Sequence, residues 1–269
     1  MKNILIEGPI NLALRAFSVF ALCGVVAFGM TSCGGSKSEV NTANANATAN
    51  FGTVNDTQAN NAVEEPVAST AQGQDSETVE ISFTALCQYP ELPNGCEITS
   101  LAALLNFYGY NVDKCDLSDN YLAKGPVGAT DFHKAFVGNP RNDDAYGCYC
   151  PVLVNAANDY LGNQGSSLRA VNLTGSTFSE LIDLLKEGTP VVVWGTQQNR
   201  QGHYSVTWNV DGVDYTWFTP EHCMVLVGYD SESDLVSLAD PMAGEIVQYD
   251  RAAFEGNYED LGNQALILQ

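Results

Sequence analysis

Cys96 and His222 are of the residue types that form a thiol nucleophile and its base. Cys96 follows the loop sequence QYPELPNG, whose prolines, asparagine and glycine disfavour a helix. From Ile98 to Tyr108, apolar residues then recur at spacings of three and four, which predicts a buried helix beginning at Cys96. Because the first turn of a helix carries partial positive charge, we expect the Cys96 thiolate to be favoured over the thiol.

Three histidines are present, and His222 is the best placed to act as the base. It directly precedes the apolar run CMVLVGY, which predicts a strand that would hold the ring at its edge. His133 and His203 lie in polar, glycine-flanked stretches. A histidine at the start of a strand is often structural, so this assignment depends on the residues around it.

Asp240 and Gln88 could complete the site. Asp240 ends the next predicted strand, and an antiparallel pairing would place its carboxylate beside the His222 ring, fixing the tautomer and stabilising the imidazolium. Alternatively, Asp240-Pro241 only starts a turn. Gln88 could donate its side-chain amide to an oxyanion together with the Cys96 backbone N–H, although a surface glutamine is the simpler interpretation.

The order of periodic segments predicts helices first and an antiparallel sheet second, which is the α+β class. A short helix is expected in KCDLSDNYL, capped near Asp116 or Ser118, and further helices over 151–161 and 176–186. A glycine-rich run at 125–151 is too long for an ordinary connector. Strands are expected at 190–194, 204–209, 213–217, 224–227, 235–238, 245–249 and 264–268, the second and third joined across Asp211-Gly212.

The first 79 residues predict export and anchoring. Lys2 and Arg15 precede an apolar stretch at 16–29, which has the length of a secretory signal core and is short of a membrane span. Met30 to Cys33 resembles a bacterial lipobox, so we expect a signal peptide over 1–33 with lipidation of Cys33; a plain signal peptide cut near Ser32 is the alternative. Residues 34–79 predict a disordered low-complexity linker, and 80–269 the folded domain, held outside the cell membrane by the lipid alone.

The formal net charge of −21 makes nucleic acid an improbable partner. It is typical of a solvated acidic surface, and a cationic substrate is the more specific interpretation. Cys148 and Cys150 are too close together for a zinc knuckle, and we expect no metal and no cofactor. Export permits disulfides, but the sequence determines neither their pairing nor the oligomeric state; the candidates are Cys87, Cys115, Cys148, Cys150 and Cys223.

Linked motifs carry a resemblance to a known family. In order, they are QYPELPNGCEITSL, KAFVGNP with YGCYCPVLVNAANDYL, GTPVVVW, WFTPEHCMVLVGYD and LADPMAG. From about Phe83 to Leu268 the chain resembles the peptidase C39-like domain, a papain-like cysteine peptidase family. The resemblance implies a papain-like fold and places the family's Gln, Cys, His and Asp on Gln88, Cys96, His222 and Asp240. The chain contains no P-loop GxxxxGK[ST], so the double-glycine leader substrate of the transporter branch is not carried over.

These observations predict a secreted, lipid-anchored cysteine peptidase or amide hydrolase whose substrate is a peptide or another amide. Two other functions fit the same residues. One is a cell-surface binding module that keeps the fold without turnover, and the other is an acyl or peptidyl transferase. The four intact site residues argue against the binding module, whereas only product analysis separates transfer from hydrolysis.

Replacing Cys33 with Ala tests the predicted anchor. Because the lipid would be attached to the Cys33 sulfur, the variant should move from the membrane fraction to the soluble fraction, as measured by immunoblotting of fractionated cells. Cys23→Ala, which changes a cysteine inside the signal, is the matched control and should leave the protein in the membrane fraction. Equal membrane retention of both variants would contradict lipidation at Cys33.

Overall fold

The computed structural model describes residues 77–269. The predicted signal peptide, the lipidation site Cys33 and the linker up to residue 76 therefore lie outside the described residues. The first strand, β1 (Thr78–Glu80), pairs antiparallel with the end of β8, so ordered pairing begins two residues before the predicted boundary at residue 80.

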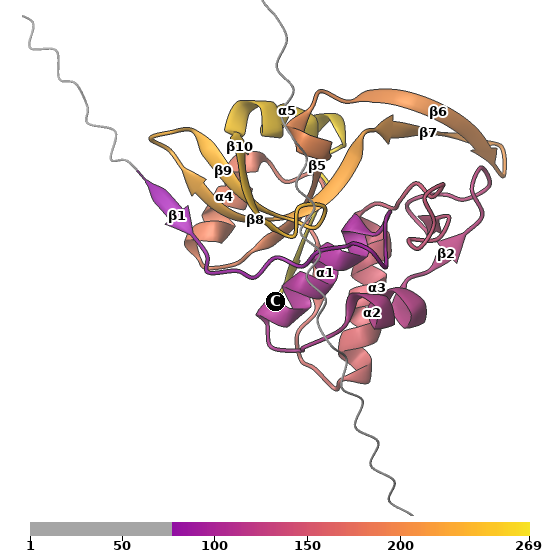
Figure 1. Cartoon of the computed structure of the whole chain (residues 1–269), viewed down its shortest axis with the longest axis horizontal. Helices are drawn as coiled ribbons and strands as arrows, with labels where there is room; N and C mark the ends of the chain where they lie inside the picture. The colour runs from indigo at the N-terminus through magenta and orange to yellow at the C-terminus, as the bar shows by residue number, and fades with distance from the viewer. Residues whose placement is uncertain (1–76) are drawn as a thin grey trace, which may run out of the picture. The chain divides into compact units, whose positions relative to one another are not determined.

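An antiparallel sheet of seven strands forms the centre of the fold (Figure 1). Six strands follow the order β10-β9-β8-β5-β11-β4, and β1 joins the edge of β8 beyond the pairing with β5. Their bounds are β4 (Ala170–Asn172), β5 (Val191–Thr196), β8 (Glu221–Asp230), β9 (Leu235–Asp240), β10 (Glu245–Asp250) and β11 (Ala265–Leu268). Every residue of β5 is buried, as expected for a β-branched strand covered on both faces.

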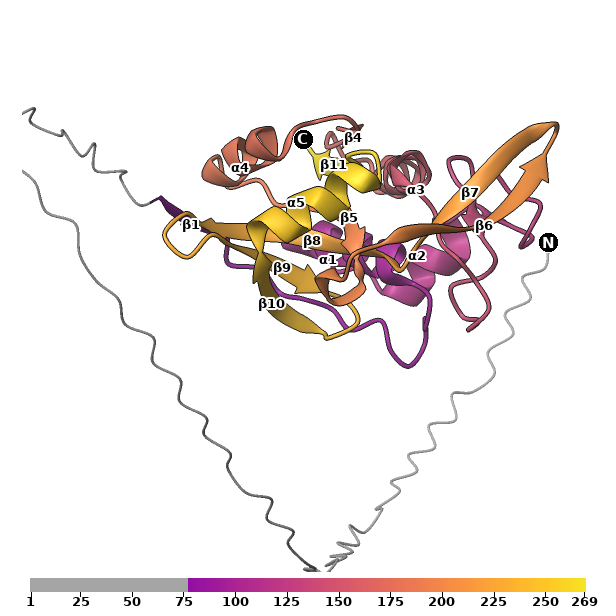
Figure 2. The same cartoon turned by 90° about the horizontal axis from the view of Figure 1, so that it is seen from above.

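Five α-helices are present in the described part of the chain, and they pack on the sheet or on one another. They are α1 (Cys96–Phe107), α2 (Lys114–Tyr121), α3 (Cys150–Asn163), α4 (Phe178–Lys186) and α5 (Arg251–Asp260). Figure 2 shows α4 and α5 on one side of β8, with α1 and α2 on the other. The predicted α+β class, with helices mostly preceding an antiparallel sheet, is confirmed.

The starts of the helices follow from local residues. Helix α1 begins at Cys96 as predicted, and Gly95 is its N-cap; a Cβ on Gly95 would lie 2.6 Å from the Leu92 Cβ, so only glycine fits there. The predicted cap of α2 near Asp116 or Ser118 is wrong. Asp113 caps this helix instead, because its side chain accepts from the N–H groups of Cys115 and Asp116.

Each predicted strand is present, and most extend further than their apolar runs. The hairpin of β6 (His203–Val210) and β7 (Val213–Thr219) projects from the rest of the fold (Figure 2). Asp211 and Gly212 connect it with φ values of 51° and 86°, as a two-residue hairpin turn requires. Helix α5 and strands β1 and β4 were not predicted from the sequence, nor was the short parallel pair β2 (Lys124–Gly125) and β3 (Phe136–Val137) inside the long glycine-rich run.

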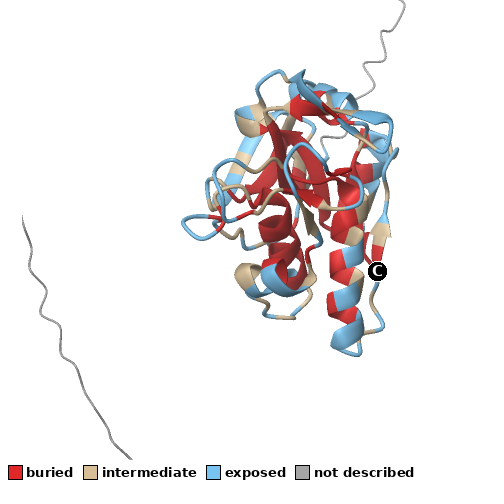
Figure 3. Cartoon of the chain, turned by 90° about the vertical axis from the view of Figure 1, so that its right-hand side faces the viewer, coloured by how far each residue is buried: buried red, intermediate tan, exposed pale blue. Residues whose placement is uncertain are grey.

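The core lies where α1 meets the central strands (Figure 3). Helix α1 is buried from Cys96 to Leu105 without interruption, so it packs on all sides rather than on one face. Serine and threonine on this helix are buried too, and Ser100 Oγ donates to the Cys223 carbonyl of β8 at 3.1 Å. This contact joins the helix that carries the thiol to the strand that carries the imidazole.

Gly195 of β5 allows α5 to approach the sheet closely. A Cβ on Gly195 would lie 2.9 Å from the Phe254 Cε2, so Gly195→Ala should lower the free energy of unfolding by about 1–3 kcal/mol, measured by urea denaturation. Gly162→Ala is the matched control, because nothing lies within 4 Å of that Cβ and alanine favours the helix by up to about 1 kcal/mol. Equal stability of the two variants would contradict this packing.

Candidate active site

The four residues predicted from the sequence come from three elements and one loop. Cys96 is the first residue of α1, His222 the second of β8, and Asp240 the last of β9. Gln88 lies in the loop that leads into α1. All four are at least nine-tenths buried, so the site is assembled within the core rather than on the surface.

His222 and Asp240 form a buried pair. The distance from His222 Nε2 to Asp240 Oδ1 is 2.7 Å, and the two side chains are 1% and 6% exposed. The same carboxylate oxygen accepts the N–H of Met242 at 2.7 Å, so Asp240 both orients the ring and starts the turn after β9. Burial raises the pKa of Asp240, but the hydrogen bonds from His222 and the turn outweigh burial and hold that pKa below its usual value.

The pairing leaves the second ring nitrogen of His222 available. Nε2 faces Asp240, and within residues 77–269 no hydrogen bond engages Nδ1. A carboxylate on one nitrogen fixes the tautomer and supports a positive charge on the ring. Nδ1 is therefore the atom that could exchange a proton with a thiol or with a leaving group.

Gln88 is tied to the turn after Asp240. Its backbone N–H donates to the Pro241 carbonyl at 2.8 Å, which connects the loop before α1 to the end of β9. Its side-chain Nε2 donates to the Pro93 carbonyl at 2.6 Å. A carboxamide nitrogen has two hydrogens, so the second remains to be donated to a substrate oxygen.

The Cys96 thiol is directed toward carboxyl groups. Its Sγ donates to Glu97 Oε2 at 3.3 Å, and within residues 77–269 it forms no hydrogen bond with the His222 ring. Burial raises the pKa of the Cys96 thiol well above its usual value, and the charges of Glu97 and Glu221 raise it further. The expectation that the helix end favours the thiolate is therefore wrong for this arrangement, because burial and two acidic neighbours outweigh the helix dipole.

Glu97 and Glu221 form a buried carboxyl pair that the sequence analysis missed. Glu97 is 0% exposed and Glu221 is 6% exposed. One carboxyl oxygen from each glutamate and the Cys96 sulfur all lie within 4.8 Å of one another. Glu97 Oε1 accepts the Cys148 N–H at 2.7 Å, whereas no group within residues 77–269 forms a hydrogen bond with Glu221 Oε1. Negative charge in such a cluster must be neutralised by protons or by a cation.

Aromatic side chains close the cluster on the side of the β6–β7 hairpin. The rings of Tyr149 and Trp217 stack with their centroids 5.7 Å apart. Gly147 lets this wall approach the carboxyl pair, because a Cβ there would lie 2.3 Å from Glu97 Oε1 and 3.0 Å from Trp217 Cη2. Burial, followed by the charge of Glu221, raises the pKa of Tyr149. The site therefore has a water-poor interior.

The six cysteines from Cys87 onward are all free thiols in the described chain. Cys223 and Cys148 are buried beside the carboxyl pair, whose charges raise the pKa of both thiols after the larger effect of burial. Cys150 points elsewhere, since its Sγ donates to the Ala265 carbonyl at 3.0 Å.

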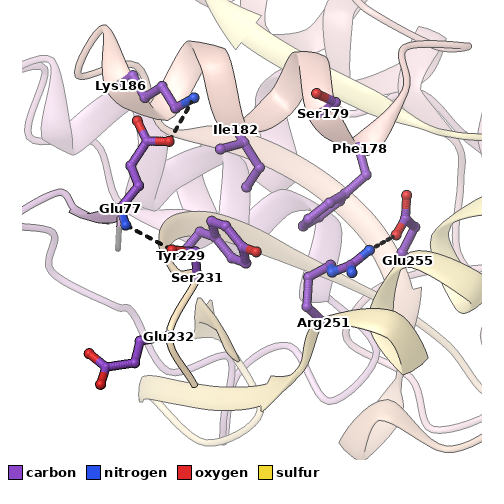
Figure 4. A pocket seen from close by; sticks show the side chains of 10 residues that line it. All are labelled: Glu77, Phe178, Ser179, Ile182, Lys186, Tyr229, Ser231, Glu232, Arg251 and Glu255. Carbon is purple, nitrogen blue, oxygen red and sulfur yellow. Dashed lines mark hydrogen bonds and ion pairs between the residues drawn. The ribbon is translucent and has the colours of Figure 1, made fainter. Parts of the chain in front are cut away.

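A cavity of about 710 Å³ lies away from these residues (Figure 4). Phe178, Ile182 and Tyr229 supply its apolar wall, and Lys186 pairs with Glu77 at 3.1 Å across its rim. None of the predicted site residues lines this cavity. In the described part of the chain, no helix is both long and apolar enough to cross a membrane.

Comparisons with known proteins identify the family of this chain and of its fold. The model of the Peptidase_C39 like family matches residues 80–266. An uncharacterized protein of Bacillus subtilis, YvpB, is 32% identical over 185 residues, which are 67% of this chain and 71% of YvpB. A crystal structure of a C39-like peptidase from Bacillus anthracis, described as putative, has 32% identity and a TM-score of 0.64, covering 72% of this chain and 98% of that one.

The Asp240 carboxylate should make stability depend on pH. Its pKa is lower in the folded protein than in the unfolded chain, so the stabilisation is present above the unfolded pKa and is lost as pH falls through the folded pKa. Between pH 6 and pH 3, the free energy of unfolding should fall more for the wild type than for Asp240→Asn, measured by urea denaturation. Asp260→Asn, at the exposed end of α5, should retain the wild-type slope. Equal slopes for wild type and Asp240→Asn would contradict the pairing.

Proposed function

Because the chain belongs to the Peptidase_C39 like family, we propose that it is a cysteine hydrolase that cleaves amide bonds in peptides through Cys96. The observation that supports this most strongly is the buried His222–Asp240 pair, joined at 2.7 Å with Nδ1 left available. An imidazole oriented in this way beside a helix-start cysteine has the parts of a nucleophile and general acid–base unit.

The proposed reaction has two stages. The Cys96 thiol first gives its proton to His222 Nδ1, and the resulting thiolate attacks the amide carbonyl. The His222 imidazolium then gives this proton to the leaving nitrogen as the carbon–nitrogen bond breaks. The oxyanion accepts hydrogen bonds from the Gln88 side chain and the Cys96 backbone N–H. Neutral His222 then takes a proton from water, which attacks the thioester and releases the acid and the thiolate.

Attack requires the sulfur to turn from Glu97 toward His222 and the substrate. The hydrogen bond that it must leave is weak, because a thiol is a poor donor. Hydrogen bonding to the Cys223 backbone favours the thiolate, and Cys223 is next to His222 in β8. The proposed mechanism therefore requires the Cys96 side chain to rotate about its Cα–Cβ bond.

The cellular setting remains part of the proposal. Export, a lipid on Cys33 and a substrate outside the cell would place the domain among extracellular peptides. Transfer of the acyl group to an amine uses the same residues, and adding a primary amine during turnover distinguishes the two reactions. Hydrolysis gives the free acid as the main product, whereas a transferase gives the amide.

A fluorogenic peptide library incubated with the purified chain tests the proposal. Cleavage by the wild type that stops after iodoacetamide treatment, with the label mapped to Cys96, supports a thiol hydrolase. Binding of peptides without any cleavage across the library would instead support a binding module on the same fold, and would contradict the proposed function.

Graded losses of turnover are expected across the four site residues, measured on soluble variants at matched concentration. Cys96→Ala should have no activity because the nucleophile is absent, and His222→Ala should be nearly inactive. Gln88→Ala should lose about 10²–10³ in turnover because one oxyanion donor is missing. Asp240→Asn should retain more activity than His222→Ala, since an amide can still orient the ring.

The exposed His203 provides a matched control, because His203→Ala should leave turnover unchanged. Circular dichroism would establish that each variant is folded. Activity persisting in Cys96→Ala would place the nucleophile elsewhere and end this mechanism.

A further inference from the structure

The carboxyl pair beside the nucleophile lacks any cationic partner. Within residues 77–269, neither Glu97 nor Glu221 forms an ion pair with lysine, arginine or histidine; the salt bridges of the described chain involve other acids. Both carboxyl groups are buried, and the Cys96 sulfur lies within 4.8 Å of each. Three ionised groups at this separation in a dry site would repel one another strongly.

The groups that face the pair are all neutral or acidic. They come from α1, the segment before α3 and β8, and comprise Cys96, Cys148, Tyr149, Cys223 and the two carboxyls themselves, whereas the nearby base His222 forms its ion pair with Asp240. An ionised Glu221 would need a hydrogen-bond donor at Oε1, and the described part of the chain supplies none. With these neighbours, the negative charge of the carboxyl groups is neutralised by protonation.

The two carboxyls differ in their partners. Glu97 accepts hydrogen bonds from the Cys96 thiol at 3.3 Å and from the Cys148 N–H at 2.7 Å, both of which favour its ionised form. Glu221 has an unpartnered buried oxygen, which favours its protonated form. Glu97 is thus the member of the pair that ionises first.

We propose that Glu97 sets the pH range in which Cys96 becomes reactive: Glu221 stays protonated beside it, and ionised Glu97 holds the thiol in its protonated form. Glu97 is a positioning residue, because it acts on the nucleophile and not on the substrate. The inference rests on Cys96 being the nucleophile of the proposed function.

The direction of the effect follows from the charges. Burial raises the pKa of Glu97 to about 7, while burial and the Glu97 charge hold Glu221 protonated well above its usual pKa. Below pH 7 Glu97 is neutral, so the thiolate fraction rises with pH as for any thiol. Above pH 7 the fraction of molecules with neutral Glu97 falls about tenfold per pH unit, which offsets the tenfold rise of thiolate in those molecules. The total thiolate fraction therefore stops rising.

The rate of alkylation of Cys96 by iodoacetamide, mapped by mass spectrometry from pH 5 to pH 9, tests the proposal on the whole chain. In the wild type the rate should rise up to about pH 7 and then level off, whereas an ordinary thiol continues to about pH 8.5. Glu97→Gln removes the charge with little change of shape. It should match the wild type at pH 6 and react about tenfold faster at pH 8, one pH unit above the Glu97 pKa.

Two further variants sharpen the test. Glu221→Gln imitates the protonated acid and should keep the wild-type profile within about twofold, as should Glu259→Gln, an exposed control on α5. If Glu97→Gln does not fold, the levelling of the wild-type profile still tests the proposal.

A wild-type rate that keeps rising to pH 8, a flat rate from pH 5 to pH 8, or a Glu97→Gln profile equal to the wild type would each overturn the inference. So would a change of rate on adding EDTA, because a bound cation would then neutralise the carboxyls. Alkylation measures ionisation of the thiol and needs no turnover. If the alkylation rate levels off at pH 7 in a chain that cleaves no peptide, the proposed function is contradicted and this inference still stands.

Discussion

The contact between the first turn of α1 and the start of β8 is the constraint on which the site depends. It places the Cys96 sulfur next to the backbone of Cys223, one residue from the imidazole, and buries both. The Ser100 hydrogen bond to the Cys223 carbonyl fixes the helix along the strand, and β9 then brings Asp240 to the ring. A shift of one residue in this packing would move the Cys96 sulfur away from the Cys223 backbone.

Burial opposes ionisation of Cys96 and of the two carboxyls beside it, so these groups are neutralised by protons. A helix start contributes about half a unit of positive charge, which lowers a thiol pKa in an exposed site. At Cys96, desolvation and two carboxyls act in the opposite direction, and unit charges 4.8 Å apart repel by about 3 kcal/mol even at an effective dielectric constant near 20. The nucleophile of the proposed hydrolase therefore rests as a thiol, and its reactivity depends on the protonation of neighbours as well as on His222.

Much of the fold could be predicted from particular residues. The start of α1 follows from the loop QYPELPNG, whose prolines and glycine cannot continue a helix, and the antiparallel strands follow from β-branched runs. The pairing of His222 with Asp240 was predictable because both lie on consecutive strands that could pair antiparallel. Helix α5 was missed because Gly256 and a weak apolar pattern conceal it, although Phe254 packs against β5.

The carboxyl pair could not be predicted from local pattern. A glutamate is usually exposed, so Glu97 and Glu221 give no sign that both point into one dry site. The one signal was that Glu97 lies in a helix whose other residues are mostly apolar. Its meaning depends on β8, which is far away in the sequence, and only the tertiary packing brings the two acids together. The resting orientation of the thiol was unpredictable for the same reason.

Detection of the acyl-enzyme tests the central claim most directly, namely that the Cys96 sulfur attacks an amide or ester carbonyl. The wild-type chain would be mixed with an activated peptide ester, quenched with acid within seconds, and digested for mass spectrometry. The account predicts an acyl group on the peptide that contains Cys96, removable by hydroxylamine as a thioester. Rapid hydrolysis with the acyl group on another residue, or with no labelled Cys96 in the quenched sample, would contradict it.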